Sequence, residues 1–168
     1  MQSVSSRISL AALLLGVVFT SSMATAATFA QAGTAFTTTG SISTAVKMLA
    51  WTPVPCNLTL TGQVAADGSH ATITGATFTP VSGTNLLCTY SAPLNLPWTL
   101  LPTSANTATL AGFSEKAAYD SCATPSTLSL QWSAASSAFN LASPFTMNAT
   151  CKITALTFKP SPVLTINP

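Results

Sequence analysis

Apolar and polar side chains alternate with a period of two in repeated short segments along this chain. The alternation recurs in six segments, at residues 58–64, 72–79, 128–132, 145–150, 153–158 and 163–166. A two-residue period places one set of side chains on a buried face of a strand and the other set on a wet face. Threonine supplies much of the polar set and suits the exposed face of a pleated sheet. The pattern predicts half-buried β-strands throughout.

The clearest predicted hairpin joins residues 56–64 to residues 71–74. Asp67-Gly68 lies between them and supplies the backbone freedom of a tight turn. The one candidate helical piece, residues 111–119, is short and is interpreted as a loop or a single turn. We therefore predict an all-β fold, a disulfide-braced antiparallel β-sandwich, with a closed β-barrel as the alternative because periodicity does not distinguish the two.

The first residues have the three parts of a secretory signal: a polar start, an apolar run over residues 8–19, and small residues before a cleavage position after Ala26, with Ala27 as the neighbouring alternative. The run is shorter than the roughly 20 residues that span a bilayer. We expect a secreted protein, extracellular or at the cell surface after transit through the periplasm, with no transmembrane segment in the mature chain. The expected divisions are a signal peptide (1–26), an extended N-terminal segment (27–50) and a single β domain (51–168).

Charged residues make up only 5% of the chain, and the formal net charge is +2. So few lysines form no basic patch, and nucleic acid is not an expected partner. A surface built from threonine, serine and alanine has few repulsive charges to keep molecules apart. The composition therefore favours self-association, or adsorption to a hydrophobic phase or a cell surface.

The four cysteines form an even set behind an export signal, which is typical of a disulfide framework. Three pairings exist, and we favour the sequential one, Cys56 with Cys88 and Cys122 with Cys151. Each bridge would then stabilise the fold by about 3–4 kcal/mol in the chain-entropy model. The spacing contains no C-x-x-C pair and the chain has one histidine, so a metal site is not predicted.

Few residues are candidates for chemistry. His70 is beside the Asp67-Gly68 turn, and Glu115 and Asp120 form the densest polar cluster, which we interpret as a solvated loop rather than a catalytic pair. We predict no catalytic, cofactor-binding or metal-binding residue and no enzymatic activity. Among the tryptophans, Trp132 continues an apolar alternation and is expected in the core, whereas Trp51 is the best candidate for exposure.

Several motifs together resemble a known family. They are Pro55-Cys56, the run from Leu60 to Ser69, Leu96-Pro97-Trp98-Thr99-Leu100, Cys151-Lys152-Ile153 and the closing run from Pro162 to Asn167. The pattern resembles the exported protein activators of alkane oxidation of hydrocarbon-degrading bacteria. The resemblance implies an extracellular accessory role in hydrocarbon use, and it supplies no active-site residues.

Two hypotheses for function follow. The first is a secreted, non-enzymatic β-domain that promotes alkane oxidation or uptake, by adsorption at the oil–water interface or by emulsification. The alternative is a structural subunit of a surface fibre or biofilm matrix, in which residues 36–43 would serve as an exchanged strand.

Overall fold

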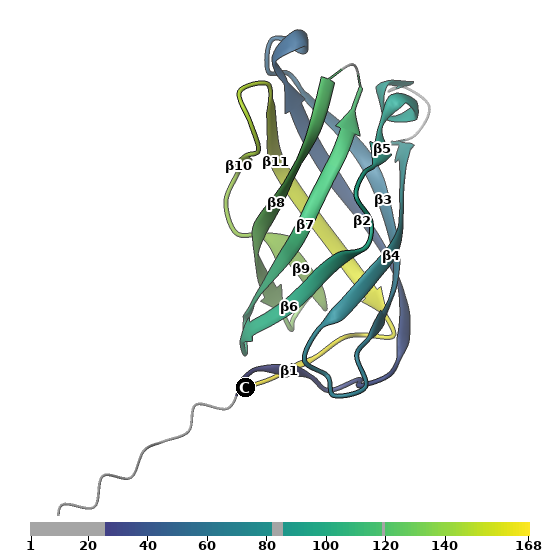
Figure 1. Cartoon of the computed structure of the whole chain (residues 1–168), viewed down its shortest axis with the longest axis vertical. Helices are drawn as coiled ribbons and strands as arrows, with labels where there is room; N and C mark the ends of the chain where they lie inside the picture. Colours follow the sequence, from purple (N-terminus) through teal and green to yellow (C-terminus); the bar gives the residue numbers. More distant parts are fainter. Residues whose placement is uncertain (1–25, 82–85, 119) are drawn as a thin grey trace, which may run out of the picture.

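The computed structural model describes residues 26–81, 86–118 and 120–168, and strands dominate it (Figure 1). The strands are β1 (Thr28–Phe29), β2 (Ala35–Val46), β3 (Pro53–Val64), β4 (Ala71–Pro80), β5 (Ala92–Pro93), β6 (Trp98–Ser104), β7 (Thr107–Ala117), β8 (Asp120–Ser133), β9 (Ala138–Leu141), β10 (Phe145–Thr146), β11 (Cys151–Ser161) and β12 (Ile166–Asn167). Two short 3-10 helices accompany them, η1 (Lys47–Leu49) and η2 (Leu86–Tyr90).

Eight strands form a closed antiparallel barrel in the order β11-β2-β3-β4-β6-β7-β8-β9. The barrel closes where β9 pairs with β11, through Phe139 opposite Phe158 and Asn140 opposite Thr157. The Thr157 hydroxyl also donates to Asn140 Oδ1 at 2.8 Å. The all-β prediction is confirmed. Of the two arrangements that the sequence leaves open, the structure has the barrel and not the sandwich, because this last pairing joins the two edges of the sheet.

The N-terminal part of the described chain belongs to the barrel. β2 lies between β11 and β3 and pairs with both along its length. Residues 28–49 therefore supply β1, β2 and η1 of the same fold, in place of an extended segment that precedes a domain at residues 51–168. The run from Thr37 to Thr44 is rich in threonine, serine and glycine, which hides its alternation of buried and exposed positions.

The predicted hairpin is confirmed, because β3 pairs antiparallel with β4 from Val64 and Ala71 upward. Gly68 has a φ of 73°, in the left-handed region that favours glycine. Asp67 Oδ1 accepts hydrogen bonds from the Ser69 amide at 2.9 Å and from the Ser69 hydroxyl at 2.7 Å. These bonds to the charged form lower the pKa of Asp67 below its usual value. Asp67 is thus a turn residue.

The interpretation of residues 111–119 as a loop or a single turn is wrong for residues 111–117, which continue β7. Gly112, with a φ of 79°, lies where the pairing register between β7 and β8 shifts, between Leu110 and Phe113. Such a bulge breaks the two-residue period, so the strand was not recognisable from alternation. Beyond the bulge the strand directs Glu115 into the barrel, where it is 1% exposed.

The barrel interior is filled by side chains. Its lower part holds an aromatic cluster around Phe139, whose ring centre lies 4.7 Å from that of Trp132, 5.2 Å from that of Phe158 and 6.4 Å from that of Phe29. Trp132 is thus a core residue, as predicted from its alternation. Close packing of large rings favours one well-defined arrangement of the interior.

The two ends of the barrel differ. At the lower end in Figure 1, β1 pairs with β12 and forms a two-stranded cover, in which Phe29 of β1 is buried, as is Leu164 just before β12. At the upper end no such strand pair is present among the described residues. That end consists of the β2–β3 connection with η1, the η2 helix, the β7–β8 hairpin and the connection from β10 to β11. We refer to these segments as the upper end.

Replacing Phe139 with alanine should lower the free energy of unfolding by about 3–5 kcal/mol, because it leaves a cavity among three aromatic rings. Chemical denaturation measures this loss. Leu101→Ala is the control, since Leu101 is 37% exposed and should cost under about 1 kcal/mol. Equal losses in the two variants would contradict an interior that is closed and tightly packed.

Candidate functional site

The wall of the barrel is incomplete on two sides of its upper half, and a disulfide lies at each. On the first side, β8 pairs with β9 only from Leu130 to Ser133, so β9 does not reach the upper parts of β8 and β11. Cys122 near the start of β8 is bonded to Cys151 at the start of β11, with their Cα atoms 5.6 Å apart. This bridge joins the two strands where backbone pairing is missing.

On the second side, β4 pairs with β6 only from Ala71 to Ile73, so the upper part of β4 has β3 as its one strand partner among the described residues. The space towards β7 is filled by η2 and β5, and β5 pairs with β7 at Glu115 and Lys116. A disulfide from Cys88 in η2 to Cys56 in β3 holds this segment on the barrel. The pairs are those that sequential pairing predicts.

The β2–β3 connection is a tight, hydrogen-bonded turn. Ala50 and Trp51 have positive φ angles of 49° and 62°, which cost non-glycine residues roughly 1–2 kcal/mol each. The amides of Ala50, Trp51 and Thr52 donate to the carbonyls of Lys47, Val46 and Leu49 at 2.9–3.1 Å. These bonds hold the turn in one shape, and Met48 at its tip is 68% exposed.

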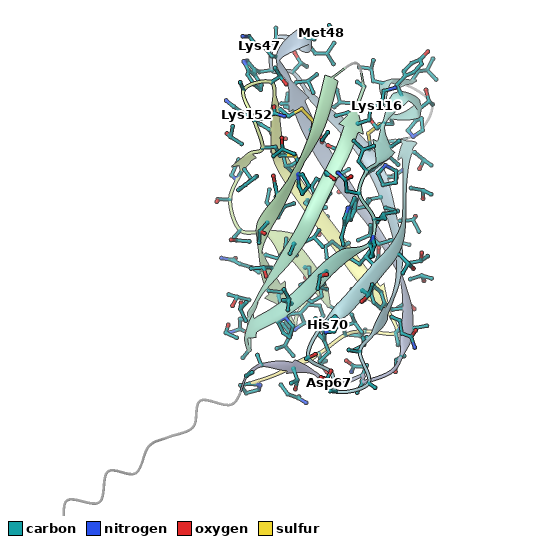
Figure 2. All side chains as sticks on the ribbon, viewed as in Figure 1. Lys47, Met48, Asp67, His70, Lys116 and Lys152 are labelled. Carbon is teal, nitrogen blue, oxygen red and sulfur yellow. A yellow bond between two sulfur atoms is a disulfide. The ribbon has the colours of Figure 1, made fainter. Side chains whose placement is uncertain are left out.

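Exposed apolar side chains and lysines occur together at this end. The three most exposed large apolar residues of the described chain are Met48 and Leu86, both at 68%, and Tyr90 at 54%. Figure 2 shows Lys47, Met48, Lys116 and Lys152 at the upper end, and Asp67 and His70 at the lower end.

Trp51, which the sequence made the best candidate for exposure, is half-buried. The Lys152 ammonium group lies over its ring, with Nζ 4.4 Å from the ring centre. A cation over an indole face gains about 0.5–1 kcal/mol at an exposed position. The contact holds the turn against the start of β11.

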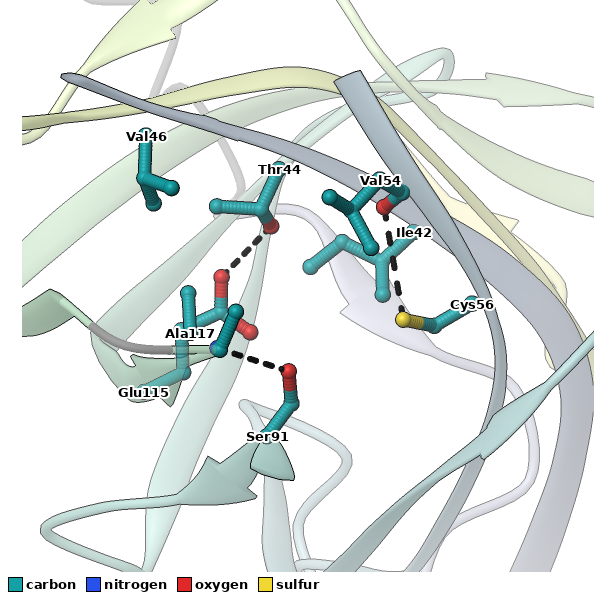
Figure 3. Close-up of a pocket in the computed structure, with 9 residues that line it drawn as sticks. Ile42, Thr44, Val46, Val54, Cys56, Ser91, Glu115 and Ala117 are labelled. Carbon is teal, nitrogen blue, oxygen red and sulfur yellow. Dashed lines mark hydrogen bonds between the residues drawn. The ribbon is translucent and has the colours of Figure 1, made fainter. Parts of the chain in front are cut away.

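A buried carboxyl group lies just inside the upper end. Glu115 accepts a hydrogen bond from the Thr44 hydroxyl at 2.6 Å (Figure 3). Beside it the Ser91 hydroxyl accepts from the Ala118 amide at 3.2 Å. Burial raises the pKa of Glu115 to about 7, while the bond from Thr44 acts in the opposite direction. The group is therefore neutral in mildly acidic water.

The cavity at Glu115 is small. Its volume is about 10 Å³, and it is lined by Ile42, Thr44, Val46, Val54, Cys56, Ser91, Glu115, Ala117 and Ala118. That is room for about one water molecule. Glu115 is the one titratable group in the lining, so this cavity does not bring together an acid and a base.

Two larger depressions, of about 380 and 320 Å³, lie elsewhere. The first is lined by residues of the β1–β2, β3 and β4 segments and the second by residues 140–144 and 154–157. Their linings consist of small, aliphatic and uncharged polar side chains. Neither lining contains His70, Glu115 or Asp120, the candidate reactive residues of the sequence.

The other candidate residues lie apart from one another. His70 Nδ1 is 2.9 Å from the Ser69 hydroxyl in the lower turn, at the opposite end from Lys116, which is next to Glu115 in β7. Asp120 opposes Ala117 across the β7–β8 hairpin, and its side chain is outside the described part of the structure. The described residues contain no group of three or more metal-ligating side chains. Sequence reasoning missed the burial of Glu115, because it interpreted this strand as a loop.

The fold and the site define a disulfide-braced β-barrel with a packed interior and an apolar, lysine-bearing end. The chain belongs to the PraA/PraB-like family of alkane oxidation protein activators, whose family model matches residues 1–168. No curated protein and no solved structure matches it. The family is described as an activator. Within the described residues, no helix is both long and apolar enough for a bilayer crossing.

Stability should depend on pH through Glu115. Its folded pKa of about 7 exceeds the ordinary value of 4.5, so the folded state holds more protons between these values. The stabilisation is complete below about pH 4.5 and is lost as pH rises through 7, a total of roughly 3 kcal/mol at 1.36 kcal/mol per pKa unit. Denaturant titrations at a series of pH values from about 4 to about 8 measure this change in the free energy of unfolding.

Glu115→Gln is the matched control, because it keeps an acceptor for Thr44 and removes the titration. The variant should show a flatter profile from pH 4.5 to 7 and greater stability than the parent above pH 7. Asp67, whose pKa is lowered, acts only below this window. An unchanged slope in the variant would contradict the assignment to Glu115.

The bridges should appear as Cys56–Cys88 and Cys122–Cys151 in non-reducing peptide mapping. Replacing either pair by serine should lower the free energy of unfolding by about 3–4 kcal/mol, since each bridge closes a loop of some thirty residues. Because the bridges lie at different gaps, the two losses should add within about 0.5 kcal/mol. Crossed pairs in the peptide map would contradict the structure.

Proposed function

We propose that this chain is a secreted, non-enzymatic accessory protein that promotes alkane oxidation by adsorbing at the oil–water interface. Membership of the family indicates a role in activating alkane oxidation. The mechanism is our inference from the surface. Alkanes barely dissolve in water, so a factor that wets or disperses droplets increases the supply to the cell.

The observation that carries the proposal is the position of the exposed apolar side chains. Met48, Leu86 and Tyr90 are the most exposed large apolar residues described, and all three are at the upper end. Apolar side chains that gather on one face are typical of interaction sites. The bonded turn under Met48 lets it meet an oil surface with little loss of conformational entropy.

The packed interior supports action at the surface. Pockets for small molecules usually measure about 300–1,000 Å³, whereas the cavity inside the barrel holds about 10 Å³. An alkane chain does not fit there without repacking the core. We therefore infer that the protein acts on hydrocarbon from outside and does not carry it within the barrel.

Secretion is part of the proposal and rests on two features. Residues 1–26 have the pattern of a cleavable export signal, and most of them are outside the described residues. The two disulfides suit an oxidising, extracellular-type compartment. A barrel braced in this way suits a protein that works outside the cell.

The fibre alternative receives less support. Residues 36–43, the expected exchange strand, lie within β2, which is hydrogen-bonded to β11 on one side and β3 on the other. Exchange of this strand between copies would require the barrel to open along both pairings. That cost makes interfacial adsorption the better-supported function.

The test adds purified mature protein, residues 27–168, to hexadecane. We expect a lower interfacial tension in a pendant-drop measurement and faster hexadecane oxidation by alkane-degrading cells, measured as oxygen uptake. A highly charged globular protein of similar size is the control for non-specific adsorption. A fall in tension without a gain in oxidation would remove the accessory role, and no change in either would remove the whole proposal.

A further inference from the structure

The upper end combines positive charge with apolar exposure. Lys47 precedes Met48 in η1, Lys116 is exposed on β7 where it pairs with β5, and Lys152 lies over Trp51. Figure 2 shows these three lysines at the upper end. Lysine keeps its ammonium group in water while its carbon stem lies along an apolar surface. The upper end can therefore place its exposed apolar side chains in an oil phase while its ammonium groups stay in the water layer at the oil surface.

The charge balance along the barrel is uneven. The acids of the upper end are Glu115, whose carboxyl group is inside the barrel, and Asp120 in the β7–β8 hairpin. Three lysines against Asp120 leave +2 there when Glu115 is protonated, and +1 when it is ionised. In the lower half, Lys159 on β11 and Asp67 in the β3–β4 turn cancel. The excess positive charge is on the end that exposes the apolar side chains.

We propose that the upper end docks on alkane droplets coated with long-chain fatty acid carboxylates. The inference rests on the proposed function and names the surface film that the site fits. Oxidation of an alkane at its terminal carbon leads to a carboxylic acid, which stays at the droplet surface with its chain in the oil. Such a film offers an apolar phase beneath an anionic layer, which complements the apolar tips and the lysines.

Docking on such a film predicts two separable contributions to the binding affinity, one from the lysines and one from the apolar side chains. Each lysine near an anionic surface should strengthen binding about fivefold at low ionic strength. Added salt screens this contribution, because the Debye length falls to about 3 Å at 1 M. Insertion of Met48 or Leu86 buries apolar area and should contribute about three- to tenfold each, with little dependence on salt.

The experiment measures binding of the disulfide-intact mature protein to hexadecane droplets doped with oleate, with the neutral oleyl alcohol at the same density, or undoped, in mildly alkaline buffer. We expect the tightest binding to the oleate droplets. Lys47→Gln and Lys116→Gln should each weaken that binding about fivefold, and Lys159→Gln, the control in the lower half, should not. In high salt these differences should vanish.

Two apolar variants complete the design. Met48→Ser and Leu86→Ser should weaken binding to every kind of droplet, whereas Val163→Ser, at a position 42% exposed outside the upper end, should not. Each variant is first checked for an unchanged unfolding midpoint. Vesicles of zwitterionic phospholipid with and without an anionic phospholipid test a membrane as the other source of negative charge.

The outcomes separate the two proposals. Equal binding to oleate, alcohol and undoped droplets overturns the carboxylate inference and leaves interfacial adsorption standing. Binding to none of the droplets overturns the proposed function itself. Anionic vesicles that bind as tightly as oleate droplets overturn the choice of a fatty acid film, and loss of binding in Lys159→Gln or Val163→Ser overturns the choice of the upper end.

Discussion

Closure of the sheet is the constraint on which the rest of this structure depends. Backbone pairing closes the barrel only in its lower half, through two residue pairs between β9 and β11 and three between β4 and β6. In the upper half the Cys122–Cys151 bridge spans the gap between β8 and β11, and the Cys56–Cys88 bridge anchors to β3 the η2 segment that fills the other gap. Without these covalent links, the wall around Glu115 would depend on the short β5 and β10 strands. The bridges therefore keep the wall closed where the sheet does not.

The two ends of the barrel differ in the same way as the two halves of its wall. The lower end is covered by β1 and β12 and rests on a tight aromatic cluster. The upper end has no such strand pair among the described residues, and its segments carry the three most exposed large apolar side chains described and three of the four lysines, Lys47, Lys116 and Lys152. A molecule with few charges elsewhere thus has one end that is suited to meet a surface. In the proposed function, a rigid wall would let that end adsorb without unfolding of the barrel.

Much of the fold follows from the sequence, because alternation and turn chemistry are local. The β3–β4 hairpin and the core position of Trp132 were predictable from patterns a few residues long. Closure of the sheet into a barrel was not predictable in this way. It depends on the pairing of β9 with β11, in which Phe139 and Phe158 are nineteen positions apart in the sequence. The bulge at Gly112 hid the strand that buries Glu115. The upper end was equally hidden, because it assembles segments that are distant along the chain.

The central claim is that a folded barrel meets oil with its upper end. Hydrogen–deuterium exchange of the protein on hexadecane droplets, compared with the protein in solution, tests it most directly. The account predicts slower exchange of amides in residues 47–52, 86–91 and 148–151, with unchanged exchange in the lower turns at residues 66–69 and 134–137. Slower exchange confined to the lower turns, or faster exchange throughout the barrel strands, would contradict it.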